Sequence, residues 1–144
     1  MPRLFSLLFV CLLVSPALAQ ERVGWDTLGR VSFEEQIEDD GWITYIPTFS
    51  DEVQALDGQT VRLAGFMIPL DFSQIQSNFL ISMLPGDGCY FHMPGGAESI
   101  AEVQAEEGVE FSYDTIEMVG TLQVLKDDPY GLLYRIVDAK PVDN

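Results

Sequence analysis

Five consecutive segments with the composition of β-strands follow Gly58, and they constrain the fold more than any other feature of the chain. The first, TVRLAGFMIPL, is apolar at both alternating sets of positions, which indicates a strand that is buried on both sides. The others are NFLISMLPG, ESIAEVQAEEG, TIEMVGTLQVLKDD and YGLLYRIVDAKPV. The alternation in ESIAEVQAEEG is less regular than in the rest, so this segment is compatible with a strand or a helix.

Two of these segments carry a glycine near their centre, Gly65 and Gly120. A glycine inside a strand marks a bulge, a bend or the close approach of another backbone, and small barrels need such positions. Five strands of this kind predict a mainly β fold, a small five-stranded barrel of the oligonucleotide/oligosaccharide-binding (OB) type, although periodicity alone does not separate a barrel from a sandwich. We expect the following apolar side chains to be buried in it: Val61, Leu63, Val119, Leu122 and Ile136.

The segment before the strands contains shorter elements. In GWDTLGR, Trp25 and Leu28 lie one helical turn apart, which suits a short turn that packs on the main body. SDEVQALDG, residues 50–58, has a capping serine, acidic residues in its first turn and a terminal glycine, which predicts a short N-terminal helix. Between these, FEEQIEDDGW is acidic, and Pro47 makes WITYIPTF an edge strand or an extended arm.

The beginning of the chain predicts export. Arg3 precedes the apolar run 4–14, and Ala17-Leu18-Ala19 fits the small-x-small cleavage pattern of a secretory signal peptide. The run is shorter than the ~20 apolar residues that a membrane span needs. We therefore expect a signal peptide at 1–19, an extended N-terminal arm at 20–49 and a β-barrel domain at 50–144. The mature chain would be periplasmic or secreted, with no transmembrane segment.

Charge limits the partners of the mature chain. The sequence holds 7 Lys and Arg against 23 Asp and Glu, a net charge of −16, and removal of Arg3 with the signal peptide leaves 6 against 23, or −17. Such a field repels nucleic acids and anionic lipid surfaces and attracts cations. We expect no nucleic-acid partner, and the same charge also keeps an exported protein soluble.

The chain's only histidine lies in GDGCYFHMPGG, residues 86–96, together with the only cysteine that remains after Cys11 leaves with the signal peptide. Thiolate and imidazole are preferred ligands of zinc and other late transition metals, so Cys89 and His92 form a C-x2-H candidate metal site. The thioether of Met93 would favour Cu(I). Zinc or copper is therefore the candidate metal, and carboxylates or a second chain would have to complete a zinc shell.

The same loop supports two other hypotheses. A thiolate next to an imidazole is a nucleophile, so Cys89 would serve a thiol-dependent enzyme. No third residue that orients a base is recognisable in the sequence, however, and a glycine-flanked loop holds geometry poorly. Alternatively the loop is purely structural, and the chain is a protein-interaction module.

Residues 58–142 resemble the bacterial family catalogued as domain of unknown function 3299 (DUF3299). The resemblance rests on the order of the motifs VRLAGFMIPL, a strand ending in proline, a cysteine-centred loop, IEMVGTLQVL and GLLYRIVDAKPV. It implies a small exported protein that accompanies a transport system, in some members one linked to metal uptake, and it implies no established catalytic activity. Some members have a second cysteine where this chain has His92, which argues against a dithiol redox role and leaves metal ligation open.

Together these features predict an exported accessory binding protein that is not an enzyme. Its predicted ligand is a soft or borderline metal, zinc or copper, held by Cys89, His92 and Met93. Its predicted partner is a membrane transport system or another periplasmic protein.

Overall fold

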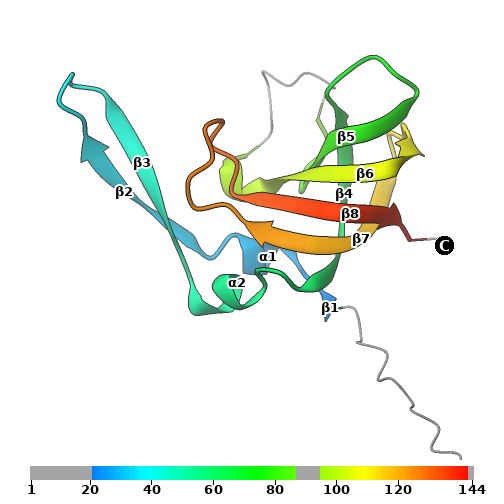
Figure 1. Ribbon diagram of the computed structural model, residues 1–144, viewed down its shortest axis with the longest axis horizontal. Coiled ribbons are helices and arrows are strands. Elements are labelled where there is room, and N and C mark those ends of the chain that lie inside the picture. Colours follow the sequence, from blue (N-terminus) through cyan, green and yellow to red (C-terminus); the bar gives the residue numbers. More distant parts are fainter. Residues whose placement is uncertain (1–20, 87–94, 143–144) are drawn as a thin grey trace, which may run out of the picture.

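The computed structural model of the protein describes residues 21–86 and 95–142, and the predicted metal ligands Cys89, His92 and Met93 lie outside the described residues. The elements follow in the order β1 (Glu21–Arg22), α1 (Trp25–Leu28), β2 (Val31–Ile37), β3 (Ile43–Phe49), α2 (Asp51–Ala55), β4 (Thr60–Pro69), β5 (Ile75–Ser82), η2 (Ala97–Ser99), β6 (Ile100–Glu110), β7 (Thr115–Val124) and β8 (Tyr134–Pro141). Five strands form a barrel, and the β2–β3 hairpin projects away from it (Figure 1).

The barrel closes in the order β4-β5-β6-β8-β7, with β7 pairing back onto β4. The β6–β8 pairing is parallel, and the other four pairings are antiparallel. This closed, mixed, five-stranded barrel with short helices confirms the predicted OB-like fold. It also shows that ESIAEVQAEEG is a strand, β6. The two residues of β1 extend the sheet through a parallel pairing with β4.

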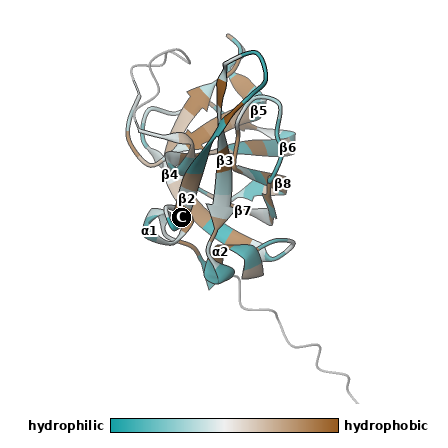
Figure 2. Cartoon of the chain, turned by 90° about the vertical axis from the view of Figure 1, so that its left-hand side faces the viewer, coloured by the Kyte–Doolittle hydropathy of each residue, from teal (hydrophilic) through white to brown (hydrophobic). Residues whose placement is uncertain are grey.

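The barrel interior is filled by the inward-facing apolar side chains of all five strands, and the barrel strands alternate in hydropathy along their length (Figure 2). Four of the five positions predicted to be buried are confirmed: Val61, Leu63, Leu122 and Ile136. The prediction for Val119 is wrong, because Met118 and Leu122 face the core and strand alternation then turns Val119 outward, where it is half-buried.

Gly65 and Gly120 are positions of close packing, as the sequence predicted. A Cβ atom on Gly65 would lie 2.5 Å from the carbonyl oxygen of Ser82. A Cβ atom on Gly120 would lie 2.6 Å from Cγ2 of Ile136 and 2.7 Å from the carbonyl oxygen of Val137. All three distances are shorter than any van der Waals contact, so a side chain at either position would push neighbouring strands apart. At Gly120 the β7–β8 register also shifts, between Val119 and Thr121.

The short helices pack against the barrel. In α2 the Ser50 hydroxyl accepts a hydrogen bond from the Val53 amide at 3.3 Å, which confirms the predicted cap. In α1 the Trp25 indole donates to the Ala64 carbonyl at 2.8 Å, and the buried Tyr134 hydroxyl donates to the Leu28 carbonyl. Burial raises the pKa of Tyr134 above its usual value. No helix among residues 21–86 and 95–142 is long and apolar enough to cross a membrane.

The segment expected to be an extended arm contains a two-stranded antiparallel sheet, β2–β3, in register from Val31 opposite Phe49 to Ile37 opposite Ile43. The turn closes with a hydrogen bond from the Glu38 amide to the Trp42 carbonyl at 2.8 Å, and Gly41 adopts φ +85°. The sequence predicts a strand or an extended arm for β3 and no strand for the acidic β2. The structure shows that β2 is a strand, stabilised by its pairing with β3.

Substitution of Gly120 by alanine should destabilise the protein by roughly 1–3 kcal/mol, because the added methyl group would overlap Ile136 and the Val137 carbonyl. Thr115→Ala, at an exposed position of the same strand, is the matched control and should change the free energy of unfolding by less than about 0.5 kcal/mol. Urea unfolding followed by circular dichroism measures both. Equal stability of the two variants would contradict the close-packing role of Gly120.

Candidate binding site on the barrel face

The loop that carries the predicted metal ligands leaves the barrel after β5 and returns at η2. Its base is closed by a hydrogen bond from the Met83 amide to the Ser99 carbonyl at 2.9 Å, and the Ser99 hydroxyl donates to the Gly96 carbonyl at 2.7 Å. Cys89, His92 and Met93 lie outside the described residues. Within the described part of the chain, no group of three or more His, Cys, Asp or Glu side chains could hold a metal ion. The metal site therefore stays a prediction.

A pocket of about 480 Å³ lies on the outer face of the barrel. It is bounded by the end of β4, the strands β5 and β6, and the loop 125–133 between β7 and β8, and its lining residues are Pro69, Leu70, Asn78, Leu80, Glu102, Tyr130 and Leu132. The neighbours of Glu102 on β6, Ala101 and Val103, point into the core. Glu102 therefore points outward, and the pocket is separate from the barrel interior.

One row of side chains crosses the barrel beneath this pocket. The pairing places Ile68 opposite Leu80, Leu80 opposite Glu102, and Glu102 opposite Arg135. Ile68 and Leu80 are almost completely buried although they lie outside the barrel core. Only 8% of the surface of Glu102 is exposed to solvent, so its negative charge needs a hydrogen-bonding or positively charged partner.

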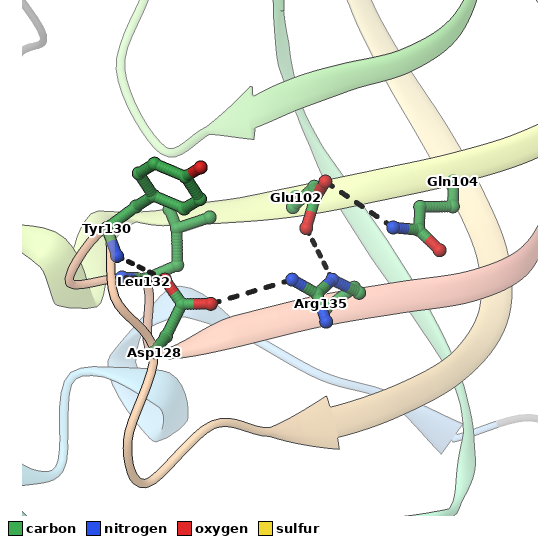
Figure 3. A network of polar contacts seen from close by, with 6 residues as sticks. All are labelled: Glu102, Gln104, Asp128, Tyr130, Leu132 and Arg135. Atoms are coloured by element: carbon green, nitrogen blue, oxygen red, sulfur yellow. Dashed lines mark hydrogen bonds and ion pairs between the residues drawn. The ribbon is translucent and has the colours of Figure 1, made fainter.

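Arg135 is that partner. Its Nε donates to a carboxylate oxygen of Glu102, and its terminal nitrogen lies 3.6 Å from Oδ2 of Asp128 (Figure 3). The Gln104 amide donates to the other oxygen of Glu102 at 3.4 Å. The side chains of Arg135, Glu102 and Asp128 are 26%, 11% and 8% exposed. One guanidinium thus compensates two largely buried carboxylates from two different parts of the chain.

Asp128 in turn shapes the loop 125–133. Its Oδ1 accepts hydrogen bonds from the amides of Tyr130 at 2.9 Å and Leu132 at 3.2 Å, and its carbonyl accepts from the Gly131 amide at 3.0 Å. Gly131 adopts φ +74°, a conformation that glycine adopts without strain. The ion pair with Arg135 therefore fixes the turn that brings Tyr130 and Leu132 to the pocket (Figure 3).

The opposite wall of the pocket is also built on an aspartate. Asp71, in the loop between β4 and β5, accepts hydrogen bonds from the Ser73 amide at 2.7 Å and from the Gln76 side chain at 3.0 Å. These hydrogen bonds lower the pKa of Asp71, and the bond from Ser73 has the largest effect. Gln76 is buried and also donates to the Ser73 carbonyl at 2.6 Å. The turn that follows Leu70 is thus held in place by local hydrogen bonds.

The pocket combines an aromatic and aliphatic wall with two polar groups, Asn78 and Glu102. Glu102 and Asp128 are both paired with Arg135, so they support the wall of the pocket. We did not predict this site from the sequence, because its residues come from four separated segments. The sequence carries one local signal, Asp127-Asp128-Pro129, a combination of residues that is typical of a turn.

These observations define the class of protein. It is a closed, mixed barrel of the OB type with a ligand-sized pocket on its outer face. A family model described as "Protein of unknown function (DUF3299)" matches residues 25–131, so the chain belongs to this family. A crystal structure of a DUF3299 family protein from Pseudomonas aeruginosa PAO1 has a similar fold, with a TM-score of 0.55 and 20% sequence identity over 88% of this chain and 98% of that one. No curated protein matches.

Replacing Arg135 by leucine should destabilise the protein by ~2 kcal/mol or more, because the two largely buried carboxylates of Glu102 and Asp128 would lose the guanidinium that pairs with both. The double variant Glu102→Leu/Arg135→Leu should recover part of this loss. Lys140→Leu is the matched control, because it removes the exposed pair with Glu107 and should change stability by less than ~1 kcal/mol. If urea unfolding showed equal losses for Arg135→Leu and Lys140→Leu, the network would not support the pocket.

Proposed function

We propose that this chain is an exported accessory binding protein that holds a small uncharged ligand in the pocket of the barrel face. The observation that carries the proposal is the largely buried network of Glu102, Arg135 and Asp128, which supports an apolar cavity of about 480 Å³. Ligand pockets commonly measure ~300–1,000 Å³ and combine apolar walls with a few polar groups. A preformed and supported cavity of this kind favours binding.

The class of ligand follows from the chemistry of the lining. Tyr130 and Leu132 offer an apolar surface, and the Asn78 amide can both donate and accept hydrogen bonds. A saccharide ring has the complementary features, one apolar face and hydroxyl groups around its edge. The net charge of −16 of the whole chain disfavours anionic ligands. We therefore propose a neutral saccharide as the ligand.

The position of the pocket supports the same class. Barrels of the OB type bind oligosaccharides or oligonucleotides on the face of their second and third strands, between the loop after the first strand and the loop before the last. Here these elements are β5, β6, the loop around Asp71 and the loop 125–133. The strong negative charge argues against oligonucleotides, which leaves oligosaccharides.

Isothermal titration calorimetry with neutral disaccharides (cellobiose, maltose, chitobiose) tests this proposal. At least one of them should bind, and Tyr130→Ala and Asn78→Ala should each weaken that binding about tenfold, a loss of ~1.4 kcal/mol. Tyr113→Ala is the matched control, because Tyr113 is an equally exposed tyrosine that does not line the pocket, and it should leave the affinity unchanged. Absence of binding, or equal affinities for all variants, would refute the proposal.

A second proposal concerns the loop of residues 86–96. The C-x2-H spacing of Cys89 and His92, with Met93 beside them, supplies soft ligands for zinc or Cu(I), and the hydrogen bond between Met83 and Ser99 holds the two ends of the loop together. In this function the protein would carry metal for a membrane transport system or another exported protein. The alternative is a thiol-dependent enzyme with Cys89 as its nucleophile.

Titration with Zn²⁺ and Cu(I) in mild reductant distinguishes these functions. A metal site should release protons on binding, and it should lose affinity in Cys89→Ser and in His92→Ala. Met93→Ala should weaken Cu(I) binding more than Zn²⁺ binding. Met83→Ala, which replaces an exposed methionine at the base of the loop, is the control for this variant. Affinity no higher than that of the Cys89→Ser/His92→Ala double variant would refute the metal site. A thiol that reacts with an activated disulfide well below pH 8 would favour the enzyme.

A further inference from the structure

The β2–β3 hairpin has two chemically different faces. In an antiparallel pair, directly opposite residues point to the same side of the sheet. The register therefore places the pairs Val31–Phe49, Phe33–Pro47, Glu35–Tyr45 and Ile37–Ile43 on one face. The other face carries Ser32–Thr48, Glu34–Ile46 and Gln36–Thr44. The first set, called here the apolar hairpin face, is apolar at every position except Glu35.

This face is buried at its base and exposed toward its tip. At the base Phe49 is buried and packs edge-on against Tyr134, with ring centroids 6.0 Å apart. Further out, Tyr45 is 57% exposed and Ile37 76% exposed, and Trp42 in the turn is 75% exposed. The hairpin also projects from the barrel in Figure 1. Its outer half therefore presents a row of large apolar side chains to solvent.

Two physical facts make such a face unusual in a protein that acts alone. An isolated two-stranded sheet is at best marginally stable in water, and a third strand or a packed surface is needed to stabilise it. Contiguous apolar side chains on a projecting element also mark sites of protein interaction. Both facts indicate that another surface covers the apolar hairpin face.

Charge selects what that surface is. Residues 31–49 contain no Lys or Arg. They contain five acidic side chains, Glu34, Glu35, Glu38, Asp39 and Asp40. Glu35 lies within the apolar face itself, opposite Tyr45. A second copy of this chain, with its own large negative charge, and an anionic membrane surface are both repelled by such a hairpin. A surface with lysine or arginine around an apolar patch is complementary to it.

We propose that the β2–β3 hairpin is a docking arm for a partner protein whose apolar contact patch is rimmed by basic side chains. Ile37, Ile43 and Trp42 supply the apolar contact, and Glu35 pairs with a basic side chain of the partner. This binding site is separate from the pocket on the barrel face, and neither proposal depends on the other.

Site-specific photocrosslinking in cells that export the full chain identifies the partner. A photoreactive phenylalanine analogue in place of Tyr45 should crosslink to one protein, which mass spectrometry identifies together with the crosslinked segment. The same analogue in place of Tyr113, an exposed tyrosine on the barrel, is the matched control and should not give that product. Crosslinking at position 45 only to a second copy of the chain or to lipid, or no crosslinking at all, would overturn the proposal.

Titration of the purified chain with that identified protein tests the chemistry of the contact. Ile37→Ser/Ile43→Ser and Glu35→Lys should each weaken binding at least tenfold, and the wild-type affinity should fall as salt is added. Glu106→Lys, at an exposed acidic position on β6, changes the net charge by the same amount as Glu35→Lys and should have less than a twofold effect. Circular dichroism checks that each variant folds. Equal effects of Glu35→Lys and Glu106→Lys, or full affinity of the isoleucine variant, would overturn the proposal.

Discussion

The closure of the barrel through β7 is the constraint on which the other features of the structure depend. This strand pairs with β4 on one side and with β8 on the other. Gly120 lets the backbones of β7 and β8 approach each other, since a side chain at this position would overlap Ile136 of β8. On the side of β7 that pairs with β4, Glu117 accepts hydrogen bonds from Arg22 at 2.7 Å and Arg62 at 2.6 Å, which join β7 to β1 and β4. Both hydrogen bonds lower the pKa of Glu117, and the bond from Arg22 has the larger effect.

The candidate pocket is a consequence of this closure. Once β7 positions β8, the parallel pairing of β8 with β6 sets Arg135 beside Glu102 and Ile136 beside Val103. Ile136 then points into the core, while Arg135 points to the outer face and reaches Asp128. Neighbouring residues of β8 thus connect the core with the pocket. Strain in the core near Gly120 would therefore be transmitted to the loop that carries Tyr130.

Much of the fold was predictable because its signals are local. Strand alternation, the central glycines and the serine cap before α2 each lie within a single segment, and the closed barrel confirms the predicted architecture. Val119 was assigned to the wrong face because its side chain is apolar, although alternation in β7 places it on the outward set with Glu117, Thr121 and Gln123. The strand β2 was missed because Glu34 and Glu35 are atypical of strands, and cross-strand pairing with β3 outweighs their intrinsic preference. The pocket was missed because pairing across the barrel, which no local pattern reveals, brings Glu102, Arg135 and Asp128 together.

The proposal that the ligand site lies on the β5–β6 face is tested most directly by nuclear magnetic resonance. Amide chemical shifts of the isotope-labelled protein would be followed during titration with a neutral oligosaccharide. We expect the changes to concentrate at residues 69–72, 78–80, 102–104 and 128–132, and to leave the hairpin at 31–49 unaffected. Changes confined to the hairpin or to the loop of residues 86–96, or no change at saturating sugar, would contradict it.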